Sequence, residues 1–452
     1  MRKVRNLMAA GLLTAAVAGI YNDAKAEVKT FIGELKPELE IRPRFDWTSK
    51  NATPGATEDA TALTTRIRLG AHINKIFDIP GLKAYLELND VSDFIDNKRT
   101  YGDVCPGSPE CKYAFIADPS ITRLTEAKIS YTWGKTTLLF GRTRVNLDDQ
   151  RFISDANWRQ TPQTFGVLAL HTKEIPNLDL LMAMVYERKW WGQDGLVATN
   201  ATGVNFTGTS SLDWSPDKAP LIFHGTYTFM PALKLTGYAY LITDASNTYG
   251  ANLRGDVKAG DISFNYLAEY ATQTDPHKNK YLPNKPKVDG DFWRIYVGAS
   301  HSSGFGGRIG YYEMSEYKIK GGVPYRGFST PLTTYHGFEG WADVLVPGTA
   351  NGFYYGLKAW HLTLNYKHKQ YGNFDLIYYN FTAKQSQPGV GDKYGNEIDI
   401  QYTKDITQRL SILLKGAFYM ADKSISLNTA VGGSASPSKD VSKYWIQLTY
   451  RY

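Results

Sequence analysis

Two absences limit what the sequence can encode. Its 452 residues include only two cysteines, which excludes a dense disulfide framework. After residue 26, no run of about 18 consecutive apolar residues occurs, so the sequence offers no hydrophobic transmembrane helix. The eight histidines are dispersed, and none lies in a nucleophile-elbow or zinc-protease motif. We therefore predict no catalytic residue, no metal site and no cofactor.

A strong charge of one sign is also missing. The net charge of the whole chain is +7, and residues 1–26 contribute four bases and one acid, which leaves +4 for residues 27–452. A balance this mild does not indicate a nucleic-acid-binding protein. The mean hydropathy of −0.36 superficially suggests a soluble protein. A membrane β-barrel averages to a similar value, however, because only every second side chain of a strand has to be apolar.

Residues 1–26 have the features of an export signal. A positively charged start is followed by a short run of apolar and small residues from Leu7 to Ile20, and the segment ends in Ala24-Lys25-Ala26. We expect its removal, with an uncleaved N-terminal membrane anchor as the alternative. No break in composition divides residues 27–452, so we predict that they form one domain.

Strict alternation is the clearest pattern in the chain. In residues 35–47, LKPELEIRPRFDW, the odd positions are essentially apolar and the even positions are charged. Successive side chains of a strand point to opposite faces, so this segment predicts a strand with one apolar and one charged face. Pro37 and Pro43 each remove a hydrogen-bond donor, and for that reason we expect an irregular strand here.

Similar runs, among them one at 353–358 that predicts a strand, recur to the end of the chain and are separated by short turns such as 133–135 and 259–261. Long loops are expected at 91–121, 146–163, 190–218, 273–290 and 318–351. About 426 residues at roughly 24 per strand and connection give ~18 strands, with 16 as the fallback. The 31 Tyr, 20 Phe, 10 Trp and 41 Gly residues suit strands, interfacial girdles and turns. The last segment, WIQLTYRY, alternates and ends in an aromatic residue. We predict an all-β fold, a transmembrane antiparallel up-and-down β-barrel.

The two cysteines, Cys105 and Cys111, lie close together in a stretch rich in glycine and proline. In an exported protein this spacing predicts a disulfide that stabilises a loop, with two free thiols as the alternative.

Residues 140–166 contain the largest group of charged side chains that could contact a solute. The bases and the acids of this segment are Arg142, Arg144, Arg151 and Arg159, and Asp148, Asp149 and Asp155. A strand leads here into a long connection that we expect to fold into the lumen. Guanidinium groups in a narrow passage attract carboxylates and phosphates. Two interpretations stay open and are compatible: the arginines contact solutes, or arginine–aspartate pairs brace the wall.

The same segment resembles a known family. Its L-D-x-Q-R-F, W-R-Q and Q-T-F motifs, following an arginine-rich strand end, are similar to those of the alginate export family of outer-membrane proteins. The matching residues are Arg142, Arg144, Leu147, Asp148, Gln150, Arg151, Phe152, Trp158, Arg159, Gln160, Gln163, Thr164 and Phe165. The resemblance covers roughly 25 residues. It implies a monomeric barrel of about eighteen strands whose arginine-rich pore conducts an anionic uronate polymer, whereas general porins are trimers.

The faces that we assign to the lumen carry charges of both signs. Further candidate pore-lining bases are Arg42, Arg44, Arg66, Arg68 and Arg294, and candidate acids are Glu38, Glu40, Glu87, Glu126, Glu269, Glu397 and Asp399. Opposed rows of charge suit polar solutes and small ions. A channel for a polyanion should carry fewer acids, so a general or small-anion porin fits equally well. Trp190-Trp191 indicates an interfacial aromatic girdle, with a sugar-stacking platform as the alternative.

These observations lead to a functional hypothesis. We expect a channel in the outer membrane of a Gram-negative bacterium, in contact with lipid and lipopolysaccharide. Its solutes would be hydrophilic and anionic, with uronate-type polysaccharide as the narrower option, and no nucleic acid is expected. The alternative is a non-conducting outer-membrane barrel that acts as a surface adhesin or as a hydrolase with its site at the rim.

Overall fold

The computed structural model describes residues 28–29, 32–101, 103, 105–192, 219–242, 246–276, 287–333, 336–345, 353–387, 391–422 and 439–452. The signal peptide expected at residues 1–26 lies outside this part of the chain and stays a prediction. Within the described residues, no helix is both long and apolar enough to cross a membrane.

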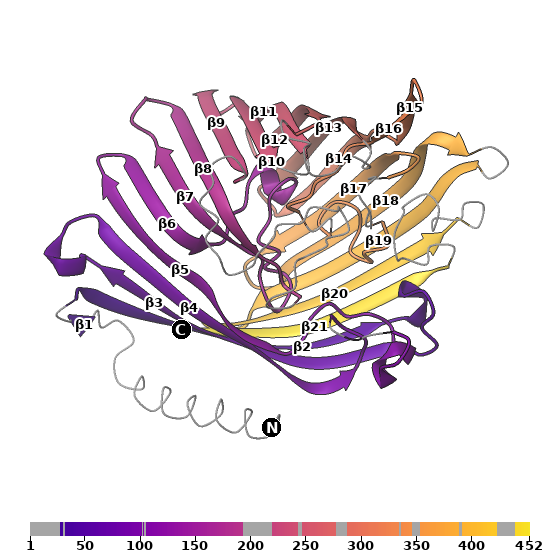
Figure 1. Cartoon of the computed structure of the whole chain (residues 1–452), viewed down its shortest axis with the longest axis horizontal. Coiled ribbons are helices and arrows are strands. Elements are labelled where there is room, and N and C mark those ends of the chain that lie inside the picture. The colour runs from indigo at the N-terminus through magenta and orange to yellow at the C-terminus, as the bar shows by residue number, and fades with distance from the viewer. Residues whose placement is uncertain are drawn as a thin grey trace.

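Eighteen long strands form the wall of a closed antiparallel barrel (Figure 1). Their bounds are β2 (Glu34–Thr48), β3 (Ala60–Asn74), β4 (Leu82–Asn97), β5 (Ile121–Trp133), β6 (Thr136–Thr143), β7 (Thr164–Thr172), β8 (Leu178–Lys189), β9 (Leu221–Met230), β10 (Leu233–Ile242), β11 (Ser246–Ala259), β12 (Ile262–Thr274), β13 (Lys287–His301), β14 (Phe305–Met314), β17 (Leu357–His368), β18 (Gly372–Gln387), β19 (Gly391–Asp405), β20 (Leu410–Ala421) and β21 (Val441–Arg451). Each strand pairs with its neighbour in the chain, β14 pairs with β17, and β21 closes the ring on β2.

The remaining elements are short. They are β1 (Val28–Lys29), β15 (Lys318–Lys320) and β16 (Val323–Arg326), and the 3₁₀ helices η1 (Lys50–Ala52), η2 (Ile76–Asp78), η3 (Pro109–Lys112) and η4 (Asp148–Gln150). The β15–β16 hairpin contacts the end of β13 and is not part of the wall. The described cysteines, Cys105 and Cys111, form a disulfide with their Cα atoms 5.7 Å apart.

The predicted strand count is confirmed, and one of the predicted strands is corrected. Of the predicted long loops, residues 193–218, 277–286 and 346–351 lie outside the described part of the chain. The run at residues 353–358 was expected to be a strand, but the strand β17 begins only at Leu357. Phe353 is fully buried in the interior cluster of apolar side chains, and Gly356 has a φ of +72°, outside the range of a strand. The apolar residues of this run therefore serve loop packing rather than wall formation.

The irregularity expected from the two prolines is confined to one side of β2. Its register with β3 is continuous from Glu34 to Thr48. Its register with β21 includes Ile41 and resumes at Arg44. The backbone N–H and C=O groups of Leu39 form hydrogen bonds with Tyr452, the residue that follows β21. Alternate residues of a strand direct these groups to the same neighbouring strand, so the backbone of Pro37 and Pro43 also faces β21. Pro43 thus removes a donor only from the ladder with β21.

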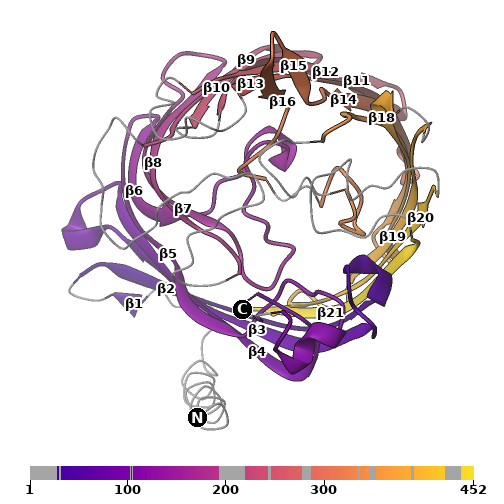
Figure 2. The ribbon, with the colours of Figure 1, turned by 45° about the vertical axis from the view of Figure 1, so that its right-hand side comes forward.

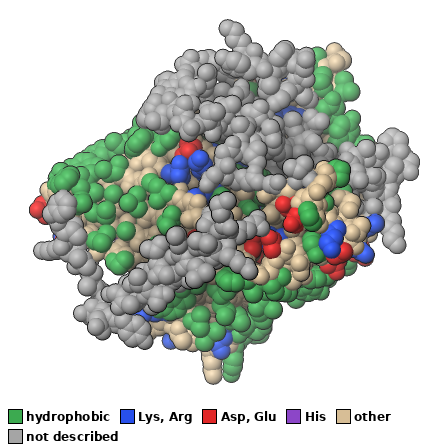
Figure 3. All heavy atoms as spheres, turned by 60° about the horizontal axis from the view of Figure 1, so that its bottom comes forward, with side chains coloured by type: hydrophobic (Ala, Val, Ile, Leu, Met, Phe, Trp, Pro, Cys, Tyr) green, Lys and Arg blue, Asp and Glu red, His purple; other side chains and the backbone are tan. Residues whose placement is uncertain are grey.

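Burial along the strands is inverted relative to a soluble protein. Ile129, Ile295 and Ile446 are between 43% and 51% exposed, whereas Arg66 and Asp399 are completely buried. Figure 3 shows hydrophobic side chains gathered over the visible wall, with charged side chains in a few clusters. A closed ring satisfies the backbone hydrogen bonds of every strand, so apolar side chains can face lipid while polar ones face inward.

The interior also contains an aromatic cluster that the sequence did not predict. The ring of Phe152, from the connection between β6 and β7, lies 5.3 Å from that of Tyr238 and 5.6 Å from that of Phe292, measured between centroids. Phe328, from the connection after β16, stacks on Phe292 at 5.3 Å. The inner face is therefore charged on β2–β5, but on β10 and β13 it is partly apolar and covered by these connections.

Candidate functional site

Two connections enter the ring and narrow its lumen (Figure 2). We call residues 144–163, between β6 and β7, the first inward loop, and residues 327–345, after β16, the second inward loop. Ile153 of the first forms a parallel bridge with Leu332 of the second. The side chain of Gln163 donates to the carbonyl of Leu332 at 2.9 Å, and the hydroxyl of Thr333 donates to the carbonyl of Gln150 at 2.9 Å. The two loops thus form one interlocked constriction, as the predicted entry of residues 146–163 into the lumen requires.

A buried ion pair joins the two inward loops. Arg151 and Glu339 are each 1% exposed, and Arg151 Nη1 donates to Glu339 Oε1. The guanidinium of Arg151 also lies 4.8 Å from the ring centroid of Tyr312 and 4.7 Å from that of Phe338. Burial raises the pKa of Glu339 to about 7, even though Arg151 acts in the opposite direction. Arg151, expected to line the pore, is therefore sequestered from solutes.

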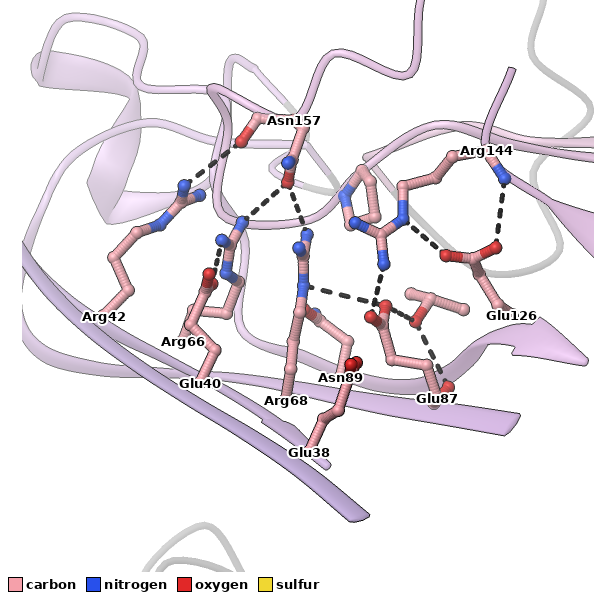
Figure 4. A network of polar contacts seen from close by, with 12 residues as sticks. Glu38, Glu40, Arg42, Arg66, Arg68, Glu87, Asn89, Glu126, Arg144 and Asn157 are labelled. Carbon is pink, nitrogen blue, oxygen red and sulfur yellow. Dashed lines mark hydrogen bonds and ion pairs between the residues drawn. The ribbon is translucent and has the colours of Figure 1, made fainter. Parts of the chain in front are cut away.

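Four arginines of the wall hold the first inward loop, and Figure 4 labels Arg42, Arg66 and Arg68 among them. We call Arg42 and Arg44 of β2 and Arg66 and Arg68 of β3 the arginine row. All four are at most 5% exposed. Alternation correctly predicted that they face inward, but they lie beneath the loop and are not open to the lumen.

Three arginines of the row donate to main-chain oxygens of the first inward loop, and Arg68 reaches that loop through the side chain of Asn157 at 2.8 Å. Arg42 donates to the carbonyl of Asn157 at 3.1 Å, to that of Arg159, and to the side chain of Gln160 at 3.1 Å. Arg44 donates to the carbonyl of residue 158 at 2.8 Å. Arg66 donates to the carbonyl of Arg159 at 3.1 Å. Four successive residues of the loop are therefore enclosed by a fan of guanidinium groups.

Carboxylates balance the positive charge of three of the four arginines in this row. Arg44 pairs with Asp46 at 2.8 Å and with Asp118. Arg66 pairs with Glu40, and Arg68 lies 3.7 Å from Glu87. Arg42 forms no ion pair with any residue that the structure describes, and its hydrogen bonds go to oxygens of the first inward loop. These four residues, which the sequence predicted to line the pore, hold the first inward loop against the wall.

Two further arginines are partly exposed, but on opposite faces of the wall. Arg142 forms a bidentate pair with Glu187, and its side chain is 24% exposed. It follows Leu138 and Phe140 on the outer face of β6, so it does not line the lumen as expected. Arg144 pairs with Glu126 at 2.7 Å and with Glu87, and its side chain is 22% exposed. Water and solutes can reach the guanidinium group of Arg144, in contrast to those of the arginine row.

The remaining acids and bases predicted in residues 140–166 lie in different surroundings. Asp149 is 43% exposed at its side chain and bridges Arg254 at 3.0 Å and Arg294 at 3.3 Å. Burial would raise the pKa of Asp149, but these two arginines hold it below its ordinary value. Arg159 lies 4.0 Å from Asp343, and its guanidinium covers the ring of Trp158. The side chain of Asp148 lies outside the part that the structure describes.

The prediction of an interfacial girdle at Trp190-Trp191 is wrong. Trp191 is only 7% exposed, and Arg159 of the first inward loop lies 5.3 Å from its ring centroid. Trp190 packs on Trp191 and on Tyr101, each at 4.5 Å. Both rings belong to an interior aromatic cluster and not to the lipid-facing surface.

Several residues of the constriction were missed from the sequence. Asn157 acts partly through its carbonyl, for which no side-chain pattern exists. The second inward loop was recognised only as a long connection. Lys415 was overlooked, although a single base in the otherwise apolar segment LSILLKGAFYMA was a usable signal. Within the described residues, no group of three or more His, Cys, Asp or Glu side chains is arranged to hold a metal ion.

Comparison with solved structures identifies the fold. Acinetobacter baumannii OccAB2 matches with a TM-score of 0.66 and 16% identity, over 94% of this chain and 99% of that one. The outer-membrane protein OprD of Pseudomonas aeruginosa matches with a TM-score of 0.63 and 15% identity, over 95% and 97%. Pseudomonas aeruginosa OpdL matches with a TM-score of 0.64 and 14% identity, over 92% and 98%. No protein-family model and no curated protein sequence matches the chain.

These matches support a porin-like barrel and give no support to the narrower resemblance to the alginate export family. The chain therefore has the closed eighteen-stranded fold of the OprD- and Occ-type outer-membrane barrels.

Proposed function

We propose that the protein is a channel of the Gram-negative outer membrane that admits small hydrophilic solutes and prefers anions. The observation that carries the proposal is a closed barrel, apolar outside, whose charged lumen is narrowed by two inward loops. The likeness to outer-membrane proteins such as OprD supports the same location. Enzymatic activity is not part of the proposal, since the charged groups of the lumen are engaged in ion pairs and loop contacts.

The preference for anions follows from the accessible cations. Arg144 keeps 22% of its side-chain surface open and lies at the start of the first inward loop. Beneath that loop, Arg42 contributes a positive charge without an ion-pair partner among the described residues. Charges in a cleft with low-dielectric walls raise the local concentration of counter-ions. Glu87 and Glu126, which pair with Arg144, moderate this field, so we expect a preference for anions and not strict exclusion of cations.

A uronate-type polymer is the less favoured solute. The two inward loops are interlocked by a buried ion pair and main-chain bonds, so a thick polysaccharide chain would have to displace them. A small carboxylate or phosphate needs only a narrow, hydrated passage. We therefore propose small anionic and polar solutes rather than polysaccharide export.

The test is the zero-current potential of the protein in a planar bilayer under a KCl gradient. We expect a sign that indicates preference for chloride, and a shift toward zero selectivity in the double variant Arg144→Ala and Arg159→Ala. A matched control removes two exposed bases on the short-turn side, Lys258 and Lys369, and should change the potential little. Unchanged selectivity in the first double variant would refute the role of these arginines. A folded protein that never conducts would favour the adhesin or rim-hydrolase alternative.

A further inference from the structure

Lys415 of β20 lies inside a box of indole rings. Its Nζ atom is 3.8 Å from the ring centroid of Trp341, 5.3 Å from that of Trp445 and 5.8 Å from that of Trp158. Aromatic faces attract cations within about 6 Å of the ring centroid, and groups of such faces recognise ammonium ligands. The side chain is partly exposed, so it borders the lumen.

The polar partners of Lys415 complete an ammonium site. Its Nζ donates to Nε2 of His336 at 2.8 Å, and Nδ1 of His336 then donates to Asp343 at 2.8 Å. The ring of His336 also stacks on Trp158 with centroids 3.5 Å apart. Burial, followed by the nearby charge of Lys415, lowers the pKa of His336 to about 3, and Arg159 acts in the same direction while Asp343 opposes it. Neutral His336 with its proton on Nδ1 is the form whose Nε2 can accept a hydrogen bond from an ammonium group.

The box is assembled from three distant parts of the chain. Trp158 belongs to the first inward loop, Trp341 to the second, and Trp445 to the wall strand β21. The second loop is also tied to β19, because the N–H of Trp341 donates to Asp399 at 3.1 Å and that of Ala342 to Glu397 at 2.7 Å. A single ammonium group therefore contacts both loops and the wall at the same place.

A glycine permits this close approach. Gly340 has a φ of +87°, and a Cβ atom at this position would lie 2.3 Å from Glu397 Oε2. Any side chain here would strain the backbone and collide with the carboxylate of Glu397, which accepts from the N–H of Ala342. The position of Trp341 over Lys415 thus depends on a close approach to Glu397 that glycine allows without strain.

We propose that Trp158, Trp341 and Trp445 form a binding cage for a primary ammonium group, which the chain fills with its own Lys415, and that this contact fastens both inward loops to the wall. The proposal deepens and rests on the proposed channel function, because fastening the loops sets the width of the passage. Lys415 is a positioning residue and is not assigned to solute binding.

Chemical rescue tests the proposal. Lys415→Ala removes three carbons and the ammonium nitrogen, which together correspond to n-propylammonium. In planar bilayers, we expect the variant to lose the steady single-channel level and to conduct more, with frequent transitions, because the loops are no longer held. Millimolar n-propylammonium should restore the steady level in a saturable manner, whereas 1-propanol, of the same size without charge, should not. Lys369→Ala, an exposed lysine of the β17–β18 turn, is the matched control.

A second readout does not depend on conductance. Tryptophan fluorescence of Lys415→Ala should change on titration with n-propylammonium, and the change should be lost when Trp341→Leu is added. If the protein never conducts but this binding is seen, the cage stands and the channel function fails. If the protein conducts but 1-propanol restores it equally, or Lys415→Ala conducts like the unmodified protein, the cage proposal is overturned. Should Lys415→Ala not fold, Lys415→Met keeps the apolar stem, and an unchanged single-channel level in that variant would equally overturn the proposal.

Discussion

Arg42 separates two roles that a pore arginine can have, because lysine keeps its charge but not its shape. In the structure, Arg42 forms hydrogen bonds with three oxygens of the first inward loop: the carbonyls of Asn157 and Arg159 and the side chain of Gln160. A lysine can reach one of these acceptors in a given rotamer, but it cannot form the fork. Arg42→Lys therefore removes loop anchoring while the local electric field stays nearly constant.

The size of the effect follows from the bonds lost. A hydrogen bond to a charged group contributes about 1.5–3 kcal/mol, so losing two costs roughly 3–6 kcal/mol, an upper bound because lumen water can hydrate the freed oxygens. Even about 3 kcal/mol raises the ratio of displaced to docked loop by about a hundredfold. We expect larger and noisier single-channel currents with an unchanged zero-current potential.

The control for this experiment is Arg308→Lys. Arg308 of β14 is exposed, and its guanidinium lies over the ring of Tyr296, 4.2 Å from the centroid. It should tolerate the exchange without a change in channel noise. If Arg42→Lys has the same conductance and noise as the unmodified channel, the arginine row does not anchor the first inward loop, and the reasoning is wrong.

Two further predictions concern the contacts between the loops. Arg151→Met or Glu339→Leu alone should lower the free energy of unfolding by roughly 3–5 kcal/mol, because each variant leaves a buried charge uncompensated. The double variant should lose much less. Unfolding followed by circular dichroism measures these changes, and additive losses would contradict the coupling. His336 has a pKa of about 3, below its ordinary 6.5, so its neutral form stabilises the docked loops above pH 6.5, and this contribution is lost as pH falls from 6.5 toward 3. We expect faster amide hydrogen exchange in the second inward loop at pH 4 than at pH 7, and a smaller pH effect in His336→Gln; equal pH effects in both proteins would exclude His336 as the cause.

The barrel was predictable because its signal is local. A strand that faces lipid on one side and water on the other must alternate residue by residue, so the segment at 35–47 predicts both a strand and its faces. The error at 353–358 has the opposite origin. Phe353 and its neighbours are apolar because they pack within the ring, and a short apolar run does not distinguish wall from loop interior.

The constriction was only partly predictable because its contacts are long-range. Alternation showed that Arg42 and Arg66 face inward, but their partners lie more than 90 residues away in the first inward loop. Several of these partners are carbonyl oxygens, which every residue carries. The ammonium cage likewise needs three tryptophans from separate segments, and no spacing rule connects them. Sequence patterns therefore indicated which side chains enter the lumen, and not which of them stay accessible there.

The central claim is that this closed barrel encloses a continuous water-filled passage, and single-channel recording of the purified, detergent-folded protein tests it most directly. The account predicts discrete current steps in a planar bilayer, with a zero-current potential that indicates preference for anions. Complete absence of steps from protein whose folded state is established by a heat-dependent shift of its migration on a gel would contradict it.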